Sequence, residues 1–234
     1  MRHWVWARRV LLLVPLAVLL SCAAPVDQAQ LGSIKRIGVA SACAHQLNRV
    51  SIGFMVFANT YSRGDITSWG LDDDAVAMVA EQLKGRYSVG KARFDADYMR
   101  AHPRFLTSNP PSRGITPEPE FDAYLIILPS EQGEGVERLE GIGLYTRSRP
   151  SIRGVGALAH ANCFALVYDG RAEKRLGFAS IKGYRSLGPE LNLDNWSDYS
   201  EPQREQVRVA LQGALGSGLA QALADLRLSA RPPS

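Results

Sequence analysis

The chain has 234 residues, of which 27 are lysine or arginine and 23 are aspartate or glutamate. Three of the basic residues precede Cys22, so the remaining chain carries 24 basic residues against 23 acidic ones and is almost neutral. This balance, together with the lack of any basic stripe interleaved with aromatic residues, argues against nucleic-acid binding. The length that remains suits one domain with a substantial hydrophobic core.

The first 21 residues have the three parts of an export signal: a basic start, an apolar run over residues 10–20, and small residues around Cys22. A membrane-spanning helix needs about 20 apolar residues, so this run is too short to span, and Pro15 also interrupts it. Arg8-Arg9 is a partial twin-arginine signal, but general secretion is favoured. We therefore expect residues 1–21 to be a signal peptide.

The residues Leu19-Leu20-Ser21-Cys22 resemble the lipobox of bacterial lipoproteins. The resemblance implies cleavage before Cys22, a diacylglyceryl thioether on its sulfur and an acylated amino terminus. Each buried methylene contributes about 0.8 kcal/mol, so two or three acyl chains hold a protein on a membrane stably. Ala23, and not aspartate, follows Cys22, which implies the periplasmic face of the outer membrane. The alternative is a soluble secreted protein, cut after Ala23 or Ala24.

With Cys22 acylated, Cys43 and Cys163 remain. In an oxidising compartment they form either one disulfide or two buried thiols, and a disulfide closing so long a loop contributes about 3 to 5 kcal/mol. His45 and His160 stand near them in the sequence, so the four side chains also match the ligand set of a structural zinc site. Paired cysteines bind no zinc, so the two hypotheses exclude each other. We favour no metal and no cofactor.

Residues 22–33 are small and polar and are expected to be a tether, followed by a single domain over residues 34–234. The first part of the domain predicts strands over 34–40, 49–58 and 87–94, a loop over 59–70 and a helix over 71–86. Asp72, Asp73 and Asp74 open this helix, where acids cap it and complement its dipole. Three successive helical side chains cannot all face one metal ion.

Residues 95–120 contain five prolines and are expected to be an irregular insert. An insert of this length is usually functional or disordered, so it is a candidate partner surface. Residues 121–128 follow, and their continuous apolar run predicts a central strand buried on both faces.

The last part of the chain predicts a strand over 142–146, a hairpin of residues 163–169 and 175–183, a loop over 187–199 and a helix over 201–226. Phe164, Leu166 and Tyr168 alternate on the first arm of the hairpin, and Leu176 and Phe178 on the second. Ser200 and Gln203 form a capping box at the helix start, and three glycines in the helix allow a close approach to the sheet. Trp196 and Tyr199 of the loop are candidate residues of a partner surface.

The order of elements predicts an α/β (α+β) fold, with a mixed sheet of about five to six strands and one mid-chain and one long C-terminal helix packed on it. Residues 35–39, 71–85, 121–128 and 164–183 resemble the α/β domains of three envelope groups. These are the curli-secretion lipoprotein, the amino-terminal domain of the Tol-system periplasmic protein, and the lipoprotein activators of penicillin-binding proteins. The resemblance implies a non-catalytic module that binds protein. The insert and the 187–199 loop depart from it, so it implies no particular partner.

The sequence contains no nucleophile elbow, phosphate-binding glycine loop or metalloprotease helix motif, and we predict no catalytic residue. Ser88-Val89-Gly90-Lys91 matches the Ser-x-x-Lys of penicillin-recognising enzymes, but it falls in a predicted strand and not at a helix start. Arg63-Gly64-Asp65 is expected to be a loop turn.

We therefore predict an outer-membrane-anchored periplasmic lipoprotein that binds other envelope proteins in the assembly or maintenance of the cell envelope. Its expected partners are the membrane, through lipid on Cys22, and envelope proteins, with the oligomeric state left open. The alternative is a small-molecule or glycan-binding protein, or a hydrolase, with a pocket near residues 187–199.

Overall fold

The computed structural model describes residues 31–53, 59–101, 114–132, 139–147, 156–191 and 195–229. The strands are β1 (Arg36–Ser41), β2 (Gln46–Ile52), β3 (Thr60–Asp65), β4 (Ser88–Lys91), β5 (Ala123–Pro129), β6 (Glu131–Gln132), β7 (Leu139–Arg147), β8 (Leu158–Asp169) and β9 (Arg175–Ser186). The helices are α3 (Leu71–Leu83), α4 (Ala96–Ala101) and α6 (Glu201–Asp225), and there are short 3-10 turns η2 (Thr67–Trp69), η3 (Pro189–Leu191) and η4 (Trp196–Asp198).

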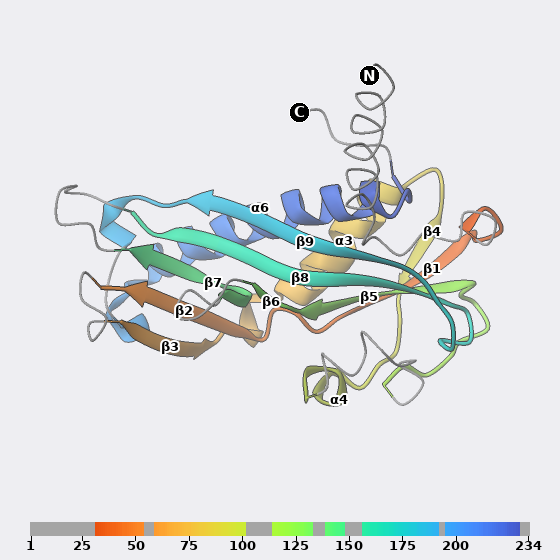
Figure 1. Ribbon diagram of the computed structural model, residues 1–234, viewed down its shortest axis with the longest axis horizontal. Helices are drawn as coiled ribbons and strands as arrows, with labels where there is room; N and C mark the ends of the chain where they lie inside the picture. The colour runs from red at the N-terminus through yellow and green to blue at the C-terminus, as the bar shows by residue number, and fades with distance from the viewer. Residues whose placement is uncertain are drawn as a thin grey trace, which may run out of the picture.

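The described strands form one mixed sheet in the order β3-β2-β7-β8-β5-β1-β4, with β9 also paired to β8 and the short β6 paired to β7. In Figure 1, β7, β8 and β9 lie in front of α3 and α6, which cover the other face of the sheet. We call the face under these helices the inner face and the opposite one the outer face. The predicted fold class and both predicted long helices are confirmed, and the sheet has more strands than the five or six expected.

On one side of β8, two pairs of strands follow one another end to end, and both pairs are interrupted at the same level. β8 pairs with β5 through residues 163–169 and with β7 through residues 158–162, so β5 and β7 follow one another along one edge of β8. β1 pairs in parallel with β5, and β2 pairs in parallel with β7, so β1 and β2 also follow one another. We call the interruption the seam; its described residues are 42–45 and 130–132. The seam divides the sheet into a β4-β1-β5 half and a β3-β2-β7 half.

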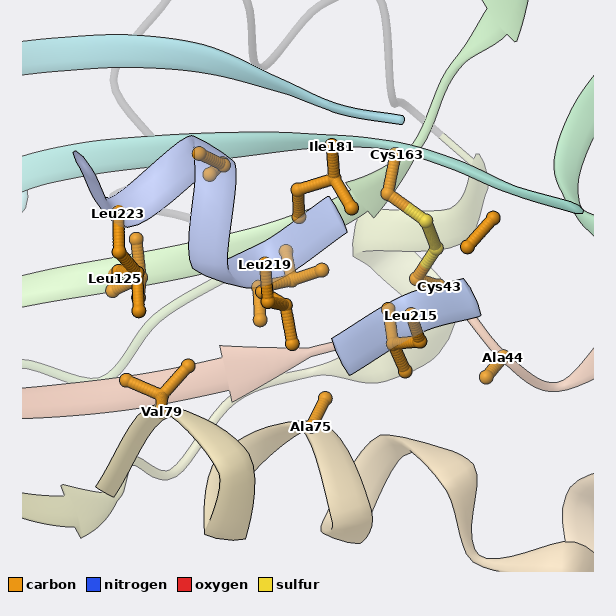
Figure 2. Close-up of a cluster of buried hydrophobic side chains, with 14 of the residues drawn as sticks. Cys43, Ala44, Ala75, Val79, Leu125, Cys163, Ile181, Leu215, Leu219 and Leu223 are labelled. Atoms are coloured by element: carbon orange, nitrogen blue, oxygen red, sulfur yellow. A yellow bond between two sulfur atoms is a disulfide. The ribbon is translucent and has the colours of Figure 1, made fainter. Parts of the chain in front are cut away.

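The main core lies between the inner face and the helices. Figure 2 shows side chains of α6, α3 and the sheet meeting in this core, among them Leu219, Val79 and Leu125. The predicted central strand is confirmed, since residues 123–128 of β5 are buried on both faces. The apolar stripe of α6 is buried, and its capping box of Ser200 and Gln203 is present.

Glycines let α6 lie directly on β9. A Cβ atom added at Gly218 would lie 2.8 Å from Cγ2 of Ile181, and one added at Gly183 would collide with the carbonyl oxygen of Ala214. Glycine spacing in α6 therefore does allow close approach, as the sequence suggested. Each glycine lowers helix propensity by about 1 kcal/mol, which the helix–sheet packing offsets.

A smaller core covers part of the outer face. Tyr124, Ile126 and Leu166 are buried there against Met99 of α4 and Ile115. The hydroxyl of Tyr124 accepts a hydrogen bond from the backbone N–H of Glu118 at 2.5 Å, which fixes the segment after the insert against the sheet.

Several predicted segments differ from the structure, and the first arm of the predicted hairpin, residues 163–169, begins earlier, at Leu158 of β8. Residues 60–65, expected in a loop, form β3, and Arg63-Gly64-Asp65 is part of this edge strand and not a turn. Because β3 is polar on both faces, it has no apolar alternation to reveal it. Residues 96–101, expected to be irregular, form α4, where Asp95 accepts from the N–H of Tyr98 and Met99 is buried. β2 begins at Gln46, earlier than expected, while residues 54–58 of the predicted strand lie outside the described residues.

Candidate functional site

Cys43 and Cys163 form a disulfide in the inner-face core, with their Cα atoms 6.4 Å apart (Figure 2). Cys43 belongs to the seam, and Cys163 is opposite Pro129, the last residue of β5. The disulfide therefore ties the chain between β1 and β2 to the middle of β8.

The zinc hypothesis is wrong, because disulfide-bonded sulfurs are not thiolate ligands. His160 is three residues from Cys163 along β8, and successive side chains of a strand point to opposite faces. His160 therefore lies on the face opposite Cys163. Among the described residues, no group of three or more histidine, cysteine or acidic side chains is placed to hold a metal ion.

The three aspartates at the start of α3 have three different partners. The Oδ1 atom of Asp72 accepts from the Ser41 hydroxyl at 2.6 Å and from the backbone N–H groups of Cys43 and Ala44 at 2.9 and 3.2 Å. Asp73 pairs with Lys91, and Asp74 accepts from the side-chain amide of Gln212. None of them caps the helix, since the N-cap residue is Gly70. Asp72 instead satisfies backbone donors of the seam that no strand reaches.

A cavity of about 550 Å³ opens at the seam, at the carboxyl ends of β1 and β4 and the start of α3. We call it the seam cavity. β1 lies between β4 and β5, both parallel to it, and in open sheets a ligand usually binds at such a switch in strand order. The lining includes His45, Asp72, Lys91, Arg93 and Arg100.

Lysine and arginine side chains that line the seam cavity form ion pairs with acidic residues. Lys91 contacts Asp73 at 2.5 Å, and Arg93 contacts Glu118 at 2.8 Å. Burial lowers the pKa of His45, and the positive charge of Arg100 lowers it further. The lining hydroxyl of Ser41 donates to the carboxylate of Asp72, and the same carboxylate oxygen accepts from two backbone N–H groups of the seam.

The outer face of β9 is open, and no described helix crosses it (Figure 1), whereas most outer-face residues of β8 are buried. Phe178 is 37 % exposed and Tyr184 is 42 % exposed on this face. The ring of Phe164, partly buried, lies 5.1 Å from that of Phe178. We call Phe164, Phe178 and Tyr184 the aromatic face. Phe178 and Tyr184 are six residues apart on β9 and share its outer face, so they are candidate contacts for a partner protein.

A buried polar chain lies beside the aromatic face. The hydroxyl of Tyr184 donates to Oδ1 of Asn162 at 3.3 Å, and the amide nitrogen of Asn162 lies 3.2 Å from Nδ1 of His160. This arrangement assigns the histidine proton to Nε2. Burial lowers the pKa of His160 to about 4. A Cβ atom added at Gly143 would lie 2.6 Å from Nε2, so glycine makes room for the ring.

Trp196 and Tyr199 lie in a packed aromatic cluster. Their rings are 5.0 Å apart, and Trp196 also stacks edge-on with Trp69 at 5.5 Å. Tyr199 is only 2 % exposed, and its hydroxyl donates to the carbonyl of Leu191 at 2.6 Å. Neither the seam cavity nor a groove beside α6 is lined by either residue. Of the pair, Trp196 alone keeps partly exposed atoms, and its part in a partner surface stays a prediction.

Cys22 and the rest of the predicted signal peptide lie outside the described residues, as do residues 102–113 of the proline-rich insert. In the part of the chain that the structure describes, no helix combines the length and the apolar character needed to cross a bilayer. The acylation of Cys22 and the insert's role as a partner surface therefore stay predictions.

No family model matches the chain, and no curated protein matches it. Among solved structures, it is similar to a Xanthomonas campestris protein of the family DUF330, with 9% identity, a TM-score of 0.40, and coverage of 83% of this chain and 85% of that one. A lipoprotein from Neisseria meningitidis matches with 14% identity and a TM-score of 0.31 over 82% of this chain and 99% of its own. A hypothetical protein from Chlamydia trachomatis matches with 9% identity and a TM-score of 0.40 over 82% and 95%. Likenesses this distant support no conclusion about function.

Proposed function

We propose that this protein is a lipid-anchored periplasmic module of the outer membrane that binds another envelope protein through its aromatic face. The observation that carries the proposal is the exposure of Phe178 and Tyr184 on the outer face of β9, which no described helix covers. A helix-covered face would bury such side chains. Aromatic residues are enriched in protein–protein interfaces because each buries a large area at a small loss of side-chain freedom.

Export is supported by two independent features. The first 22 residues have the parts of a lipoprotein signal, which implies acyl chains on Cys22. The disulfide between Cys43 and Cys163 suits an oxidising compartment, since such bonds are rare in the cytosol. Anchored by acyl chains, the domain would present the aromatic face to partners close to the membrane.

The test is affinity capture from detergent-solubilised membranes of cells that produce the protein, combined with mass measurement of the amino-terminal peptide. We expect acyl mass on Cys22 and enrichment of one envelope protein. The double variant Phe178→Glu, Tyr184→Glu should lose this enrichment, because it places charge on the aromatic face.

Tyr61→Glu is the matched control, since Tyr61 is 57 % exposed on β3, away from the aromatic face. It should capture the same protein as the unaltered chain. Equal capture by the double variant, or an unmodified Cys22, would contradict the corresponding part of the proposal.

A second candidate is the binding of a small molecule in the seam cavity, favoured by its volume of about 550 Å³ and its place at the carboxyl ends of β1 and β4. The alternative prediction from the sequence places a pocket near residues 187–199, but none of these residues lines the seam cavity. Binding of a defined amino acid or sugar, lost in Arg100→Ala and kept in the aromatic-face double variant, would support this candidate over the first.

A further inference from the structure

β9 is an edge strand whose backbone is open along one side. It pairs with β8, and among the described residues it has no strand on its other side. The N–H of Leu187 donates to the carbonyl of Ala157, the residue opposite it in the register. In an antiparallel pair, hydrogen-bonded and non-hydrogen-bonded positions alternate. The odd-numbered residues from 177 to 185 therefore face β8, and the even-numbered residues from 178 to 186 direct their N–H and C=O groups outward.

Within the described part of the chain, almost all of these outward groups are unpaired. Phe178, Ser180 and Lys182 form no other backbone hydrogen bond within the described residues. The carbonyl of Tyr184 accepts from the Arg185 side chain at 3.2 Å. A row of free backbone donors and acceptors at this spacing is complementary to one kind of structure, another extended strand.

A groove lies beside the carboxyl end of the same edge, on the inner side. It has a volume of about 510 Å³ and is lined by Arg185 and Ser186 of β9 and by Glu205, Val209 and Gly213 of α6, among others. Val209 is 53 % exposed. A strand added to β9 would place an inner-face side chain in this groove near Arg185, and its outer-face side chains beside Phe178 and Tyr184. Of the four large apolar side chains exposed in the described residues, three, Phe178, Tyr184 and Val209, thus border one edge.

The charge of β9 selects among possible strands. Arg175, Lys182 and Arg185 are exposed, and the strand contains no acidic residue. Antiparallel pairing of β9 with a second copy would bring two such basic strands together, and like charges across a strand pair are destabilising. An incoming strand with acidic side chains is complementary.

We propose that the β9 edge binds an acidic, extended segment of a partner protein as an added strand, with apolar residues entering the groove at Val209. This rests on the proposed function as a protein-binding module and names the chemistry of the partner.

The test uses the full mature chain in detergent and a labelled heptapeptide of alternating valine and glutamate. Three matched peptides are compared with it: one with lysine in place of glutamate, one with N-methylated alternate amides, and one in scrambled order. We expect the valine–glutamate peptide to bind at least tenfold more tightly than the others, and more weakly as salt is raised. On binding, the amides of Phe178, Ser180 and Lys182 should exchange with deuterium at least tenfold more slowly.

Lys182→Pro tests the edge itself. The lost N–H points away from β8, so the variant removes a donor and blocks the incoming strand while leaving the β8 ladder intact. We expect it to lose peptide binding, and Lys182→Glu to weaken it several-fold. Lys84→Glu makes the same charge change at the exposed end of α3 and should leave binding unchanged.

Several outcomes would overturn the inference: no preference for the acidic peptide, binding that survives Lys182→Pro, or edge amides that become protected by concentration alone, which would make a second copy the occupant. The proposed function is judged separately. If the aromatic-face double variant loses capture of the envelope protein while Lys182→Pro keeps it, the module binds protein, but not by strand addition.

Discussion

The two faces of the β8–β9 ribbon differ because the long helix α6 lies along one, while on the other α4 packs only near Leu166. On the inner face, small residues such as Ala161, Ala165 and Gly183 let α6 approach closely, and all are buried. On the outer face, the same strands carry Phe164, Phe178 and Tyr184. Close packing of a helix on a sheet favours small side chains at the contact, while an uncovered face has room for large ones. The size of alternate residues therefore indicates which side is already occupied.

The largest expected effect comes from the disulfide in the inner-face core. The variant Cys43→Ala, Cys163→Ala should lose about 4 to 5 kcal/mol in the free energy of unfolding, because the bond closes a loop with a sequence separation of 120. Urea unfolding monitored by circular dichroism measures it. Cys22→Ala, which leaves the bond intact, is the control, and a loss below about 1 kcal/mol in the double variant would mean that the bond does not constrain the unfolded chain.

Gly183→Val should destabilise the inner face by about 3 kcal/mol or more, since its side chain collides with the carbonyl of Ala214 in α6. Ser180→Val, on the outer face of the same strand, should change stability by less than about 1 kcal/mol. Thermal unfolding compares the two variants. Equal effects would show that α6 can shift to make room and that the faces do not differ as described.

The pH dependence of stability isolates His160. Its folded pKa of about 4 lies below the ordinary value of 6.5, so between these values the unfolded chain binds a proton that the folded chain does not. Stability should fall as pH drops from about 6.5 to about 4, by roughly 3 kcal/mol, since one unit is worth about 1.4 kcal/mol.

His160→Gln should flatten this slope in urea titrations repeated at each pH. The slope that remains would belong to other groups, including His45, whose pKa is lowered too. An unchanged slope in the variant would exclude His160 as the source.

The smallest effect concerns the rim of the aromatic face. Tyr184→Phe removes the hydroxyl that donates to Asn162, which should cost about 0.5 to 1.5 kcal/mol because the buried amide oxygen loses its donor. Ser180→Ala on the same face should have no measurable effect. A stability gain in Tyr184→Phe would indicate that the hydroxyl serves binding and not folding.

The sequence predicts those parts whose pattern is local. The continuous apolar run of β5, the capping box and stripe of α6 and the β8–β9 hairpin all carry periodicity within one element. The prediction for this hairpin is wrong in one respect, the register of its second strand. Leu176 and Phe178 were expected on one face, but a bulge opposite Val167 adds a residue, so Leu176 enters the inner core and Phe178 the outer face.

The seam and the candidate sites depend on contacts between distant residues. Asp72 looks like a helix cap in the sequence, and only the fold brings it to the amides of Cys43 and Ala44. β9 has an open edge because no further strand pairs with it among the described residues. The sequence of β9 alone does not predict this. Exposed Lys182 is the nearest signal, since lysine is common on edge strands.

The seam also has a mechanical consequence. β5 and β7 each pair with a different stretch of β8, while β8 and β9 run past the seam without interruption. The two strands are therefore a common backing for both halves of the sheet. The Cys43–Cys163 disulfide fixes the chain between β1 and β2 to that backing.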